Sequence, residues 1–402
     1  MISRTAFAFL TLLSASPAGE PRFEAQVIDA TIGIGYGLAV GDVDGDGKPD
    51  ILLADAREIV WYQNPTWKKR QLTGSLTKHD HVCIAARDVD GDGRVEVAVG
   101  AQWNPGVTTN DSESGAVFYL QRPANGDDGP WTPLALPHEP TVHRMHWVRD
   151  GQGKAHLIVV PLHGRGNKNG AGTEGVKIHD FTFPDNPADA AAWVPRVLSG
   201  DLHVTHNFDY QMEGGGERLV IGGKEGFLDA APQAGGWSAN VQHLTDTPGA
   251  SPAFAGIGEI RFFPASAGNR DPTRLAAIEP FHGPHLAIYQ KDASTRQWMR
   301  QVIDSSMNQG HALACGDVLG VGNSQIVAGW REPNAEGKFG VRLHWQESPD
   351  QPWRMAWVAD GNTMACEDLK LADVDEDGRL DVIAAGRSTK NVVIYWNRPG
   401  PP

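Results

Sequence analysis

The stretch LAVGDVDGDGKPDILLA, residues 38–54, decides the fold of this chain. It joins two short runs of small and apolar residues through an Asp-rich turn, and Gly47 allows the sharp bend of that turn. Short apolar runs bounded by Gly and Asp are typical of β-strands. Residues 38–41 and 50–54 are therefore predicted to be two antiparallel strands.

The same phrase recurs along the chain, which indicates a repeat architecture. Clear copies occupy residues 84–100 and 369–386. Degenerate copies keep a recognisable second strand at residues 157–160, 219–222, 275–278 and 325–329. A third strand, often rich in aromatic residues, follows most second strands, as at residues 60–62 (VWY) and 176–178 (VKI), and a tryptophan marks the fourth strand. Seven such copies predict an all-β chain folded as a seven-bladed β-propeller.

The two ends of the chain are predicted to complete one blade together. The seventh copy has no fourth strand after Asn397, whereas the strand-like run FEAQVI, residues 23–28, precedes the first copy. Pairing this run with residues 392–396 closes the ring and leaves no open sheet edge.

The first residues have the order of a secretory signal peptide, with a basic start, an apolar run at residues 6–13 and small residues after it. We expect residues 1–19 to be a signal peptide and residues 20–402 to be the propeller. The protein is then exported to the periplasm or the cell exterior. No later run reaches the roughly 20 apolar residues of a transmembrane helix.

Charge and cysteine content narrow the range of partners. The net charge of -14 disfavours nucleic acid and anionic membranes and is compatible with cation binding. The 3 cysteines are too few for a disulfide framework. They leave two arrangements open, one disulfide with a free thiol or three thiols.

The Asp-rich turns predict calcium sites of the integrin type, with magnesium as the other candidate ion. Carboxylates at alternate positions of a tight turn point at one centre, and hard oxygen donors at this spacing suit calcium. The predicted ligands are Asp42, Asp44, Asp46, Asp50, Asp88, Asp90, Asp92, Glu96, Asp373, Asp375, Asp377 and Asp381. We expect these loops to stabilise the fold rather than to take part in a reaction.

Ten histidines are predicted to lie on the propeller face opposite the calcium loops. They precede first strands or follow second strands, and these connections share one face of a propeller. The ten are His79, His81, His143, His146, His163, His203, His206, His282, His285 and His311. Taken singly, each histidine is more simply a polar loop residue. Together with Trp103, Glu279, Trp330 and Arg331 they predict a cleft suited to sugars and to acid–base chemistry. His79 and His81 are also spaced to offer two ligands to zinc, without a third ligand fixed by spacing.

Three segments carry a resemblance to a known family. Residues 279–285 (EPFHGPH), 310–317 (GHALACGD) and 326–331 (IVAGWR) resemble the seven-bladed propeller domain of aldos-2-ulose dehydratase. The repeats resemble the broad FG-GAP/VCBS class, which integrins, lectin-like modules and lyases share. The chain is also similar, more distantly, to propeller ulvan lyases. In this sequence His143, His163, His206 and Lys224 occupy places comparable to those of the functional residues of these lyases. The match departs at blade four, where those lyases are expected to use Tyr and Arg.

Both narrower resemblances imply β-elimination next to a carbonyl, so a carbon–oxygen lyase of the dehydratase type is expected. The expected substrate is a keto-sugar such as an anhydrofructose or a 3-keto-glycoside. We expect His143 or His163 to be the base, His206 the acid or second base, and Arg165 with Lys224 the enolate stabilisers. Substrate contacts are expected from His79, His81, Trp103, Glu279, His282, His285, His311, Trp330 and Arg331. Competing functions are a uronate polysaccharide lyase, a non-catalytic glycan-binding or adhesion propeller, and a purely structural module. The oligomeric state is not encoded in any of these motifs.

Overall fold

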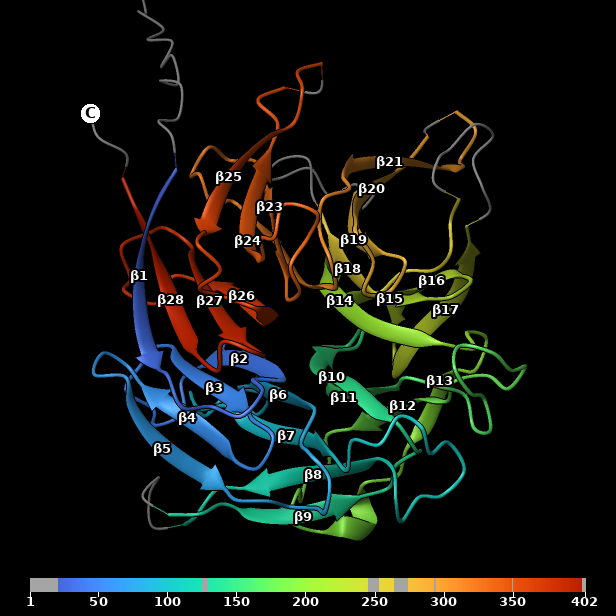
Figure 1. The fold of residues 1–402 in the computed structure, drawn as a ribbon. Coiled ribbons are helices and arrows are strands. Elements are labelled where there is room, and N and C mark those ends of the chain that lie inside the picture. The colour runs from blue at the N-terminus through green and yellow to red at the C-terminus, as the bar shows by residue number, and fades with distance from the viewer. Residues whose placement is uncertain are drawn as a thin grey trace, which may run out of the picture.

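The structure, a computed structural model, describes residues 21–124, 129–244, 253–263, 274–292, 294–348 and 350–399. The predicted signal peptide, residues 1–19, lies outside the described residues. Seven four-stranded antiparallel sheets are arranged in a ring (Figure 1). The predicted seven-bladed β-propeller is therefore confirmed.

Blades one to three follow in chain order, each from the innermost strand outward. Blade one consists of β2 (Gly37–Gly41), β3 (Asp50–Ala54), β4 (Ile59–Gln63) and β5 (Lys68–Thr73). Blade two consists of β6 (Cys83–Arg87), β7 (Glu96–Ala101), β8 (Ala116–Gln121) and β9 (Thr132–Leu136). Blade three consists of β10 (Val142–Arg149), β11 (Ala155–Pro161), β12 (Ile178–Thr182) and β13 (Arg196–Ser199), with the 3-10 helix η1 (Ala190–Ala192) before β13.

Blades four to six repeat this order. Blade four consists of β14 (Thr205–Glu213), β15 (Gly216–Gly223), β16 (Gly226–Gln233) and β17 (Gly236–His243). Blade five consists of β18 (Glu259–Phe262), β19 (Arg274–Glu279), β20 (His285–Lys291) and β21 (Trp298–Asp304). Blade six consists of β22 (Gly310–Gly316), β23 (Gln325–Trp330), β24 (Gly340–Trp345) and β25 (Arg354–Ala359).

Blade seven is shared between the two ends of the chain. It contains β26 (Cys366–Ala372), β27 (Asp381–Gly386) and β28 (Val392–Arg398), and β1 (Arg22–Asp29) is its outermost strand. β1 pairs antiparallel with β28, with Phe23 opposite Asn397 and Val27 opposite Val393. Figure 1 shows the blue N-terminal strand beside the red C-terminal one. The predicted closure of the ring by the N-terminal strand is confirmed, and the pairing with β1 covers the edge of β28.

The core lies between neighbouring blades, because each sheet packs its apolar faces against the sheets on either side. Leu52 and Trp61 of blade one, for example, share one buried cluster with Val97 and Val99 of blade two. All five residues of β3 and all six of β7 are buried. This explains why second strands are the best-conserved part of the repeat within the chain, since they are covered on both faces.

Two sequence expectations are refined by the structure. The third strand of blade three, expected at residues 176–178, instead begins at Ile178. The reason is that Val176 still belongs to the preceding loop, where its N–H donates to the carbonyl of Leu202. The cysteines are three free thiols, with Cys83 and Cys366 buried and Cys315 half-buried. No helix in the described part of the chain has the length and hydropathy to cross a bilayer.

Candidate functional site

Local irregularities at the start of the innermost strands position the candidate site. The regular pairing of the first and second strands is interrupted in blade three between Val142 and Arg144, and in blade four between Thr205 and Phe208. The same interruption occurs in blade six between Gly310 and Ala312. His143 and His311 fill the gaps in blades three and six, and His206 and Asn207 fill the gap in blade four. A β-bulge redirects side chains out of the ladder, which here turns the imidazoles away from the alternating pattern of the strand.

His282 reaches the same place from the turn between β19 and β20. The segment before β18 packs closely against this turn, and Gly256 and Gly258 make this possible. A Cβ on Gly258 would lie 2.2 Å from the carbonyl oxygen of Phe281. Phe281 itself has φ of 48°, which non-glycine residues adopt rarely. A constrained turn thus presents His282.

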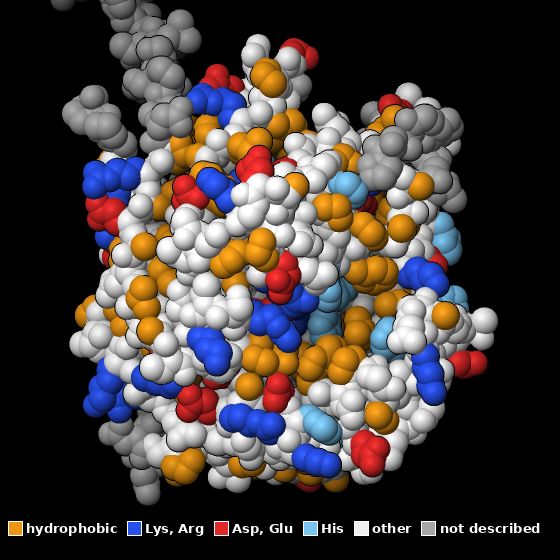
Figure 2. All heavy atoms as spheres, viewed as in Figure 1, with side chains coloured by type: hydrophobic (Ala, Val, Ile, Leu, Met, Phe, Trp, Pro, Cys, Tyr) orange, Lys and Arg blue, Asp and Glu red, His pale blue; other side chains and the backbone are white. Residues whose placement is uncertain are grey.

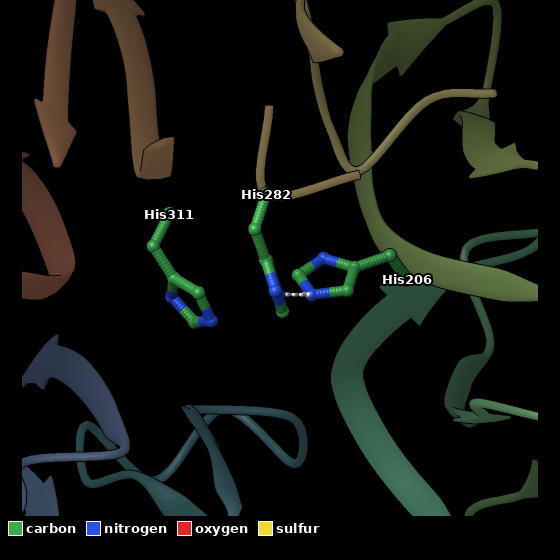
Figure 3. Close-up of side chains that lie close together, drawn as sticks. All are labelled: His206, His282 and His311. Atoms are coloured by element: carbon green, nitrogen blue, oxygen red, sulfur yellow. Dashed lines mark hydrogen bonds between the residues drawn. The ribbon is translucent and has the colours of Figure 1, made fainter. Parts of the chain in front are cut away.

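Histidines from four blades form one centre, which we call the histidine centre and define as His143, His206, His282 and His311. Nε2 of His206 lies 2.7 Å from Nε2 of His282. The ring centroids of His282 and His311 are 4.6 Å apart, and those of His143 and His206 are 4.5 Å apart. One nitrogen from each of His206, His282 and His311 lies within 4.8 Å of the others. Figure 3 shows these three side chains pointing toward one another from separate blades.

Backbone carbonyls fix which nitrogen of two of these rings faces inward. Nδ1 of His143 donates to the carbonyl of His206 over 3.0 Å, and Nδ1 of His311 donates to the carbonyl of Glu367 over 2.6 Å. A neutral imidazole that donates through Nδ1 has its lone pair on Nε2. Both rings therefore offer Nε2 as a proton acceptor or a metal ligand.

All four members of the histidine centre are held neutral. Burial is the main cause that lowers the pKa of each ring, and Arg144 or Arg331 lowers it further, whereas Glu259 offsets part of the lowering at His206. The pKa of His282 falls to about 2. Neutral imidazoles at neutral pH are both bases and good ligands for transition metals.

Arginines and one glutamate surround the centre. Glu367 is buried in the bulge at the start of β26 and accepts hydrogen bonds from Arg331 over 2.7 Å and Arg387 over 2.8 Å. Arg144 lies one residue after His143, and its guanidinium donates to the carbonyl of Val82. Arg144 and Arg331 lie near the neutral imidazoles, and their positive charge can stabilise negative charge that develops on a bound substrate.

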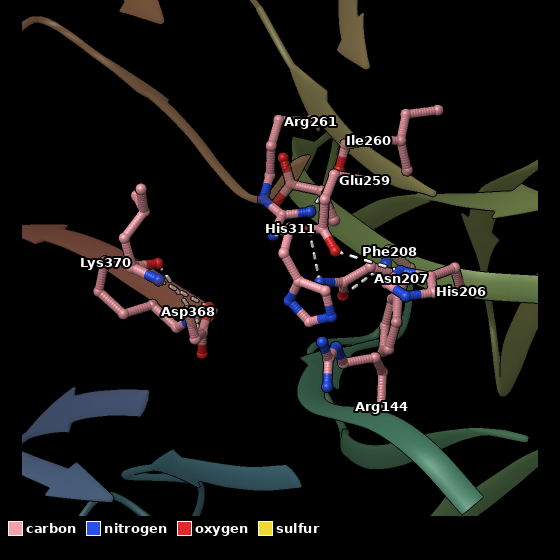
Figure 4. A network of polar contacts seen from close by, with 12 residues as sticks. Arg144, His206, Asn207, Phe208, Glu259, Ile260, Arg261, His311, Asp368 and Lys370 are labelled. Carbon is pink, nitrogen blue, oxygen red and sulfur yellow. Dashed lines mark hydrogen bonds and ion pairs between the residues drawn. The ribbon is translucent and has the colours of Figure 1, made fainter. Parts of the chain in front are cut away.

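A second polar layer lies beneath the histidines (Figure 4). Oε1 of Glu259 is 3.2 Å from Nδ1 of His206, although the two are not aligned as a good hydrogen bond and neither has another partner among the described residues. Oε2 of Glu259 accepts from Asn207 over 2.7 Å and pairs with Arg261 over 2.9 Å. Burial alone raises the pKa of Glu259, but Arg261 and His206 outweigh it and lower the pKa to about 2. The carboxylate is therefore ionised and orients the ring of His206.

The innermost strands enclose a narrow cavity on the propeller axis. Its lining includes Arg144, His146, Asn207, Asp368 and Lys370. Figure 2 shows histidine side chains beside Lys and Arg in the hollow at the middle of one face. The charged lining explains why this hollow is not filled by apolar side chains as the spaces between blades are.

The structure brings some of the predicted site residues together and leaves others apart. His143 and His206 lie in the centre with His282 and His311, and Trp103 stacks on His143 with ring centroids 4.9 Å apart. Arg331 borders the centre through Glu367. Among the described residues, no ring contact joins His163 to these histidines, and its backbone N–H donates to Thr141.

Arg165 and Lys224, the predicted enolate stabilisers, lie outside the centre. Arg165 forms ion pairs with Asp111 and Glu139, each over 2.8 Å. Nζ of Lys224 donates to the carbonyl of Gly170 over 2.6 Å and is exposed. Arg144 and Arg331 are cations that the structure places near the histidines instead.

The remaining predicted contacts have structural surroundings. Both ring nitrogens of His81 are used, one with the carbonyl of Asp55 and one with the N–H of Leu76, so His79 and His81 do not form a ligand pair. Glu279 is buried against Arg300 and Tyr289, and His285 is half-buried at the start of β20. Trp330 is buried between Trp357 and Arg342.

Each of the three Asp-rich loops gathers carboxylates on the opposite face. Ligand atoms lie within 4.8 Å of one another in the groups Asp42, Asp44 and Asp50; Asp88, Asp90 and Glu96; and Asp373, Asp375 and Asp381. Burial and neighbouring carboxylates raise the pKa of Asp50 and of Glu96 to about 7. The other three predicted ligands lie outside these groups and accept hydrogen bonds from loop amides, namely Asp46, Asp92 and Asp377. Crowded carboxylates of this kind suit a hard divalent cation, which removes their mutual repulsion.

Comparisons with known proteins identify the repeat and the fold. Residues 42–99 match the FG-GAP-like repeat family. No curated protein sequence matches the chain. BBS1N, from its crystal structure with ARL6DN, is 12% identical with a TM-score of 0.56, covering 95% of this chain and 98% of that one.

Two further solved structures share the architecture. A chain of the mitotic checkpoint complex is 12% identical with a TM-score of 0.55, covering 98% of this chain and 96% of that one. The extracellular domain of the putative one-component system BT4673 from B. thetaiotaomicron is 9% identical with a TM-score of 0.50, covering 93% of this chain and 39% of that one. At these identities the likeness concerns the fold alone.

Proposed function

We propose that this chain is an exported carbon–oxygen lyase that performs β-elimination on a keto-sugar at the histidine centre. The observation that carries the proposal is the convergence of four neutral imidazoles from separate blades, beside Arg144 and under Trp103. An elimination needs a neutral base, positive charge at the developing enolate and an aromatic platform for the sugar ring.

In this proposal His143 is the base. Its Nδ1 is committed to the carbonyl of His206, which leaves Nε2 to accept the proton from the carbon next to the substrate carbonyl. The electron pair of that C–H bond forms the enolate, with Arg144 near its oxygen. The enolate then expels the hydroxyl on the neighbouring carbon, which takes the proton from the His143 imidazolium and leaves as water, so that His143 returns to its neutral form.

His206, His282 and His311 fit a transition metal such as zinc. The three rings bring one nitrogen each within 4.8 Å of the others, and the carbonyl of Glu367 and the carboxylate of Glu259 lie behind two of them. Carboxylates and carbonyls behind the outer nitrogens are the usual way in which metal-binding histidines are oriented. When bound, such an ion supplies Lewis acidity toward a carbonyl oxygen. His206 is then a ligand, and the role of leaving-group acid passes to the protonated His143.

The Asp-rich loops are proposed to bind calcium. Their carboxylate groups lie in the connections between first and second strands, at the other end of those strands from His143, His206 and His311. Calcium there would stabilise the fold without contacting substrate. Export rests on the order of residues in the first 18 positions of the sequence.

An absorbance screen tests the proposal. The zinc-loaded protein is incubated with an anhydrofructose, 3-keto-glycosides and uronate polysaccharides, and the conjugated carbonyl product is followed in the ultraviolet. We expect product from a keto-sugar, with the rate lost in a His143→Ala variant. Product only from uronates would favour a polysaccharide lyase. An inert protein across all three classes would make a glycan-binding propeller the better account.

A further inference from the structure

A pocket between blades seven and one has features that the proposed reaction does not use. It has a volume of about 440 Å³, within the usual range for small-molecule sites. Residues from two Asp-rich loops border it, Lys48 from the loop before β3 and Glu376 from the loop before β27. The pocket therefore lies with the Asp-rich loops, away from the histidine centre.

Two tryptophans form its apolar part. The rings of Trp67 and Trp396 have centroids 6.2 Å apart and planes inclined at 50°. Trp67 has φ of 55°, an uncommon conformation for a bulky residue. Trp67 is largely buried, with 8% of its surface exposed, and its indole N–H makes no hydrogen bond to another described residue. This N–H is a donor that a ligand can use.

Trp396 is held in place from two sides. Its indole N–H donates to Gln26 of β1 over 2.9 Å, and the guanidinium of Arg398 lies 5.1 Å from the ring centroid. Arg398 is itself fixed by Asp375 over 2.7 Å. The aromatic wall is thus pre-organised, which lowers the entropic cost of binding.

The polar part of the pocket has balanced charge. Lys48 and Arg398 face the carboxylates Asp375 and Glu376. The side chains of Lys48 and Glu376 make no hydrogen bond or ion pair with other described residues. Two cations and two anions favour an uncharged ligand with several hydroxyl groups over a phosphate or a uronate, which would meet a carboxylate.

We propose that this pocket, defined by Trp67, Trp396, Lys48 and Glu376, binds a neutral pyranose unit of a glycan. The sugar ring would pack its C–H face against the inclined indoles, and its hydroxyls would bond to Lys48, Glu376 and the N–H of Trp67. The site would keep the protein on a polysaccharide independently of any reaction at the histidine centre.

A comparable pocket between blades two and three provides the control. It has a volume of about 380 Å³ and is bordered by Asp90 of the second Asp-rich loop and by Lys154, but no tryptophan lines it. If a loop lysine beside a groove were enough, the two pockets would bind alike. The proposal assigns binding to the tryptophan pair.

The test is binding of methyl pyranosides and tetrasaccharides of glucose, galactose, mannose and xylose, by isothermal titration and saturation-transfer NMR in calcium. At least one neutral sugar should bind, and Trp396→Ala should weaken its binding by about ten-fold or more. Lys48→Ala and Glu376→Ala, at surface loop positions, should each weaken it without lowering the melting temperature. Lys154→Ala should leave it unchanged, and because the panel contains no keto-sugar, a failure of the proposed reaction does not affect the result.

Two results would overturn the proposal. They are the absence of binding by every sugar in the panel, and equal binding by wild type and the Lys48→Ala and Glu376→Ala variants. The Lys48→Ala and Glu376→Ala variants leave β28 unchanged. They can therefore decide the proposal even if the Trp396→Ala variant does not fold.

Discussion

Nε2 of His206 lies 2.7 Å from Nε2 of His282, although 76 positions separate the two residues in the chain. Nδ1 of His206 faces Glu259 at 3.2 Å, which leaves the lone pair of this ring on the side of His282. Two imidazoles at this distance share one proton or one cation. Loss of any one ring of the histidine centre should therefore weaken the binding of that proton or cation by the others.

The first prediction concerns metal binding. His311→Ala removes one of the three nitrogens, so zinc affinity should fall by more than about ten-fold and the visible spectrum of a cobalt(II) derivative should disappear. Titration calorimetry and absorbance measure this. His163→Ala, on the same face but without a ring contact to the centre, is the control. Equal metal binding by both variants would contradict the ligand set.

The second prediction concerns the base. His143→Ala should lower turnover of a keto-sugar by about 100-fold, the scale of one general base, while zinc binding is retained. Steady-state kinetics at saturating substrate separate this from an effect on binding. If His163→Ala loses as much turnover as His143→Ala, the assignment of the base is wrong.

The third prediction concerns the cations. Arg144→Met should lower turnover, because the enolate would lose its nearest positive charge. Arg165→Met should have little effect on turnover, since Arg165 is engaged with Asp111 and Glu139. If both variants lost turnover to a similar extent, the substrate would bind nearer to Arg165 than proposed here.

The fourth prediction concerns calcium. Chelation should lower the melting temperature, and added calcium should restore it, because a ligand that binds only the folded state stabilises it. At a concentration of 100 times Kd this amounts to about 2.7 kcal/mol. The triple variant Asp44→Asn, Asp90→Asn and Asp375→Asn should show no response to calcium in differential scanning calorimetry. A response of wild-type size in that variant would exclude these loops as the binding sites.

The fifth prediction concerns a buried ion pair far from the centre. Asp304 accepts a hydrogen bond from Nε2 of His344 over 3.0 Å and lies 3.5 Å from Arg342. Burial alone raises the pKa of Asp304, but the bonds from His344 and Ser306 outweigh it and hold the pKa well below its usual value. The contribution to stability is then complete above the unfolded pKa of about 4 and is lost as the pH falls below it.

Asp304→Asn should therefore cost about 3 kcal/mol of unfolding free energy at pH 7, because Arg342 loses its buried counter-charge. The cost should shrink at pH 3, as measured by urea denaturation. A cost that does not change with pH would mean that the charge of Asp304 is not what stabilises the blade. Turnover per folded molecule should stay at the wild-type value.

The sequence was sufficient to predict the ring of blades and its closure. The Asp-rich phrase repeats with its strands in a fixed order, and the missing strand after Asn397 left the run at residues 23–28 as its replacement. Second strands are buried on both faces, so their apolar composition survives in the degenerate copies, for example at residues 219–222. Local pattern and global fold agree at these positions.

The histidine centre was only partly predictable. The face that carries His143 and His206 follows from topology, but which rings converge depends on bulges that no local pattern reveals. Glu259 and Arg261 were missed because β18 has no copy of the Asp-rich phrase. Two charged residues that flank Ile260 in a short strand were the available signal, since a charge on an innermost strand must face the channel or be paired.

The bulges at the start of the innermost strands also bear on how such a protein could be redesigned. Blades one and two begin with the regular pairs Gly37–Ala54 and Cys83–Gly100 and contribute no ring to the histidine centre. A single inserted residue ahead of Leu38 or Ile84 would give them the irregular start that blades three, four and six have. New functional groups could then be added one blade at a time, because the rest of each hydrogen-bonded ladder would keep its partners.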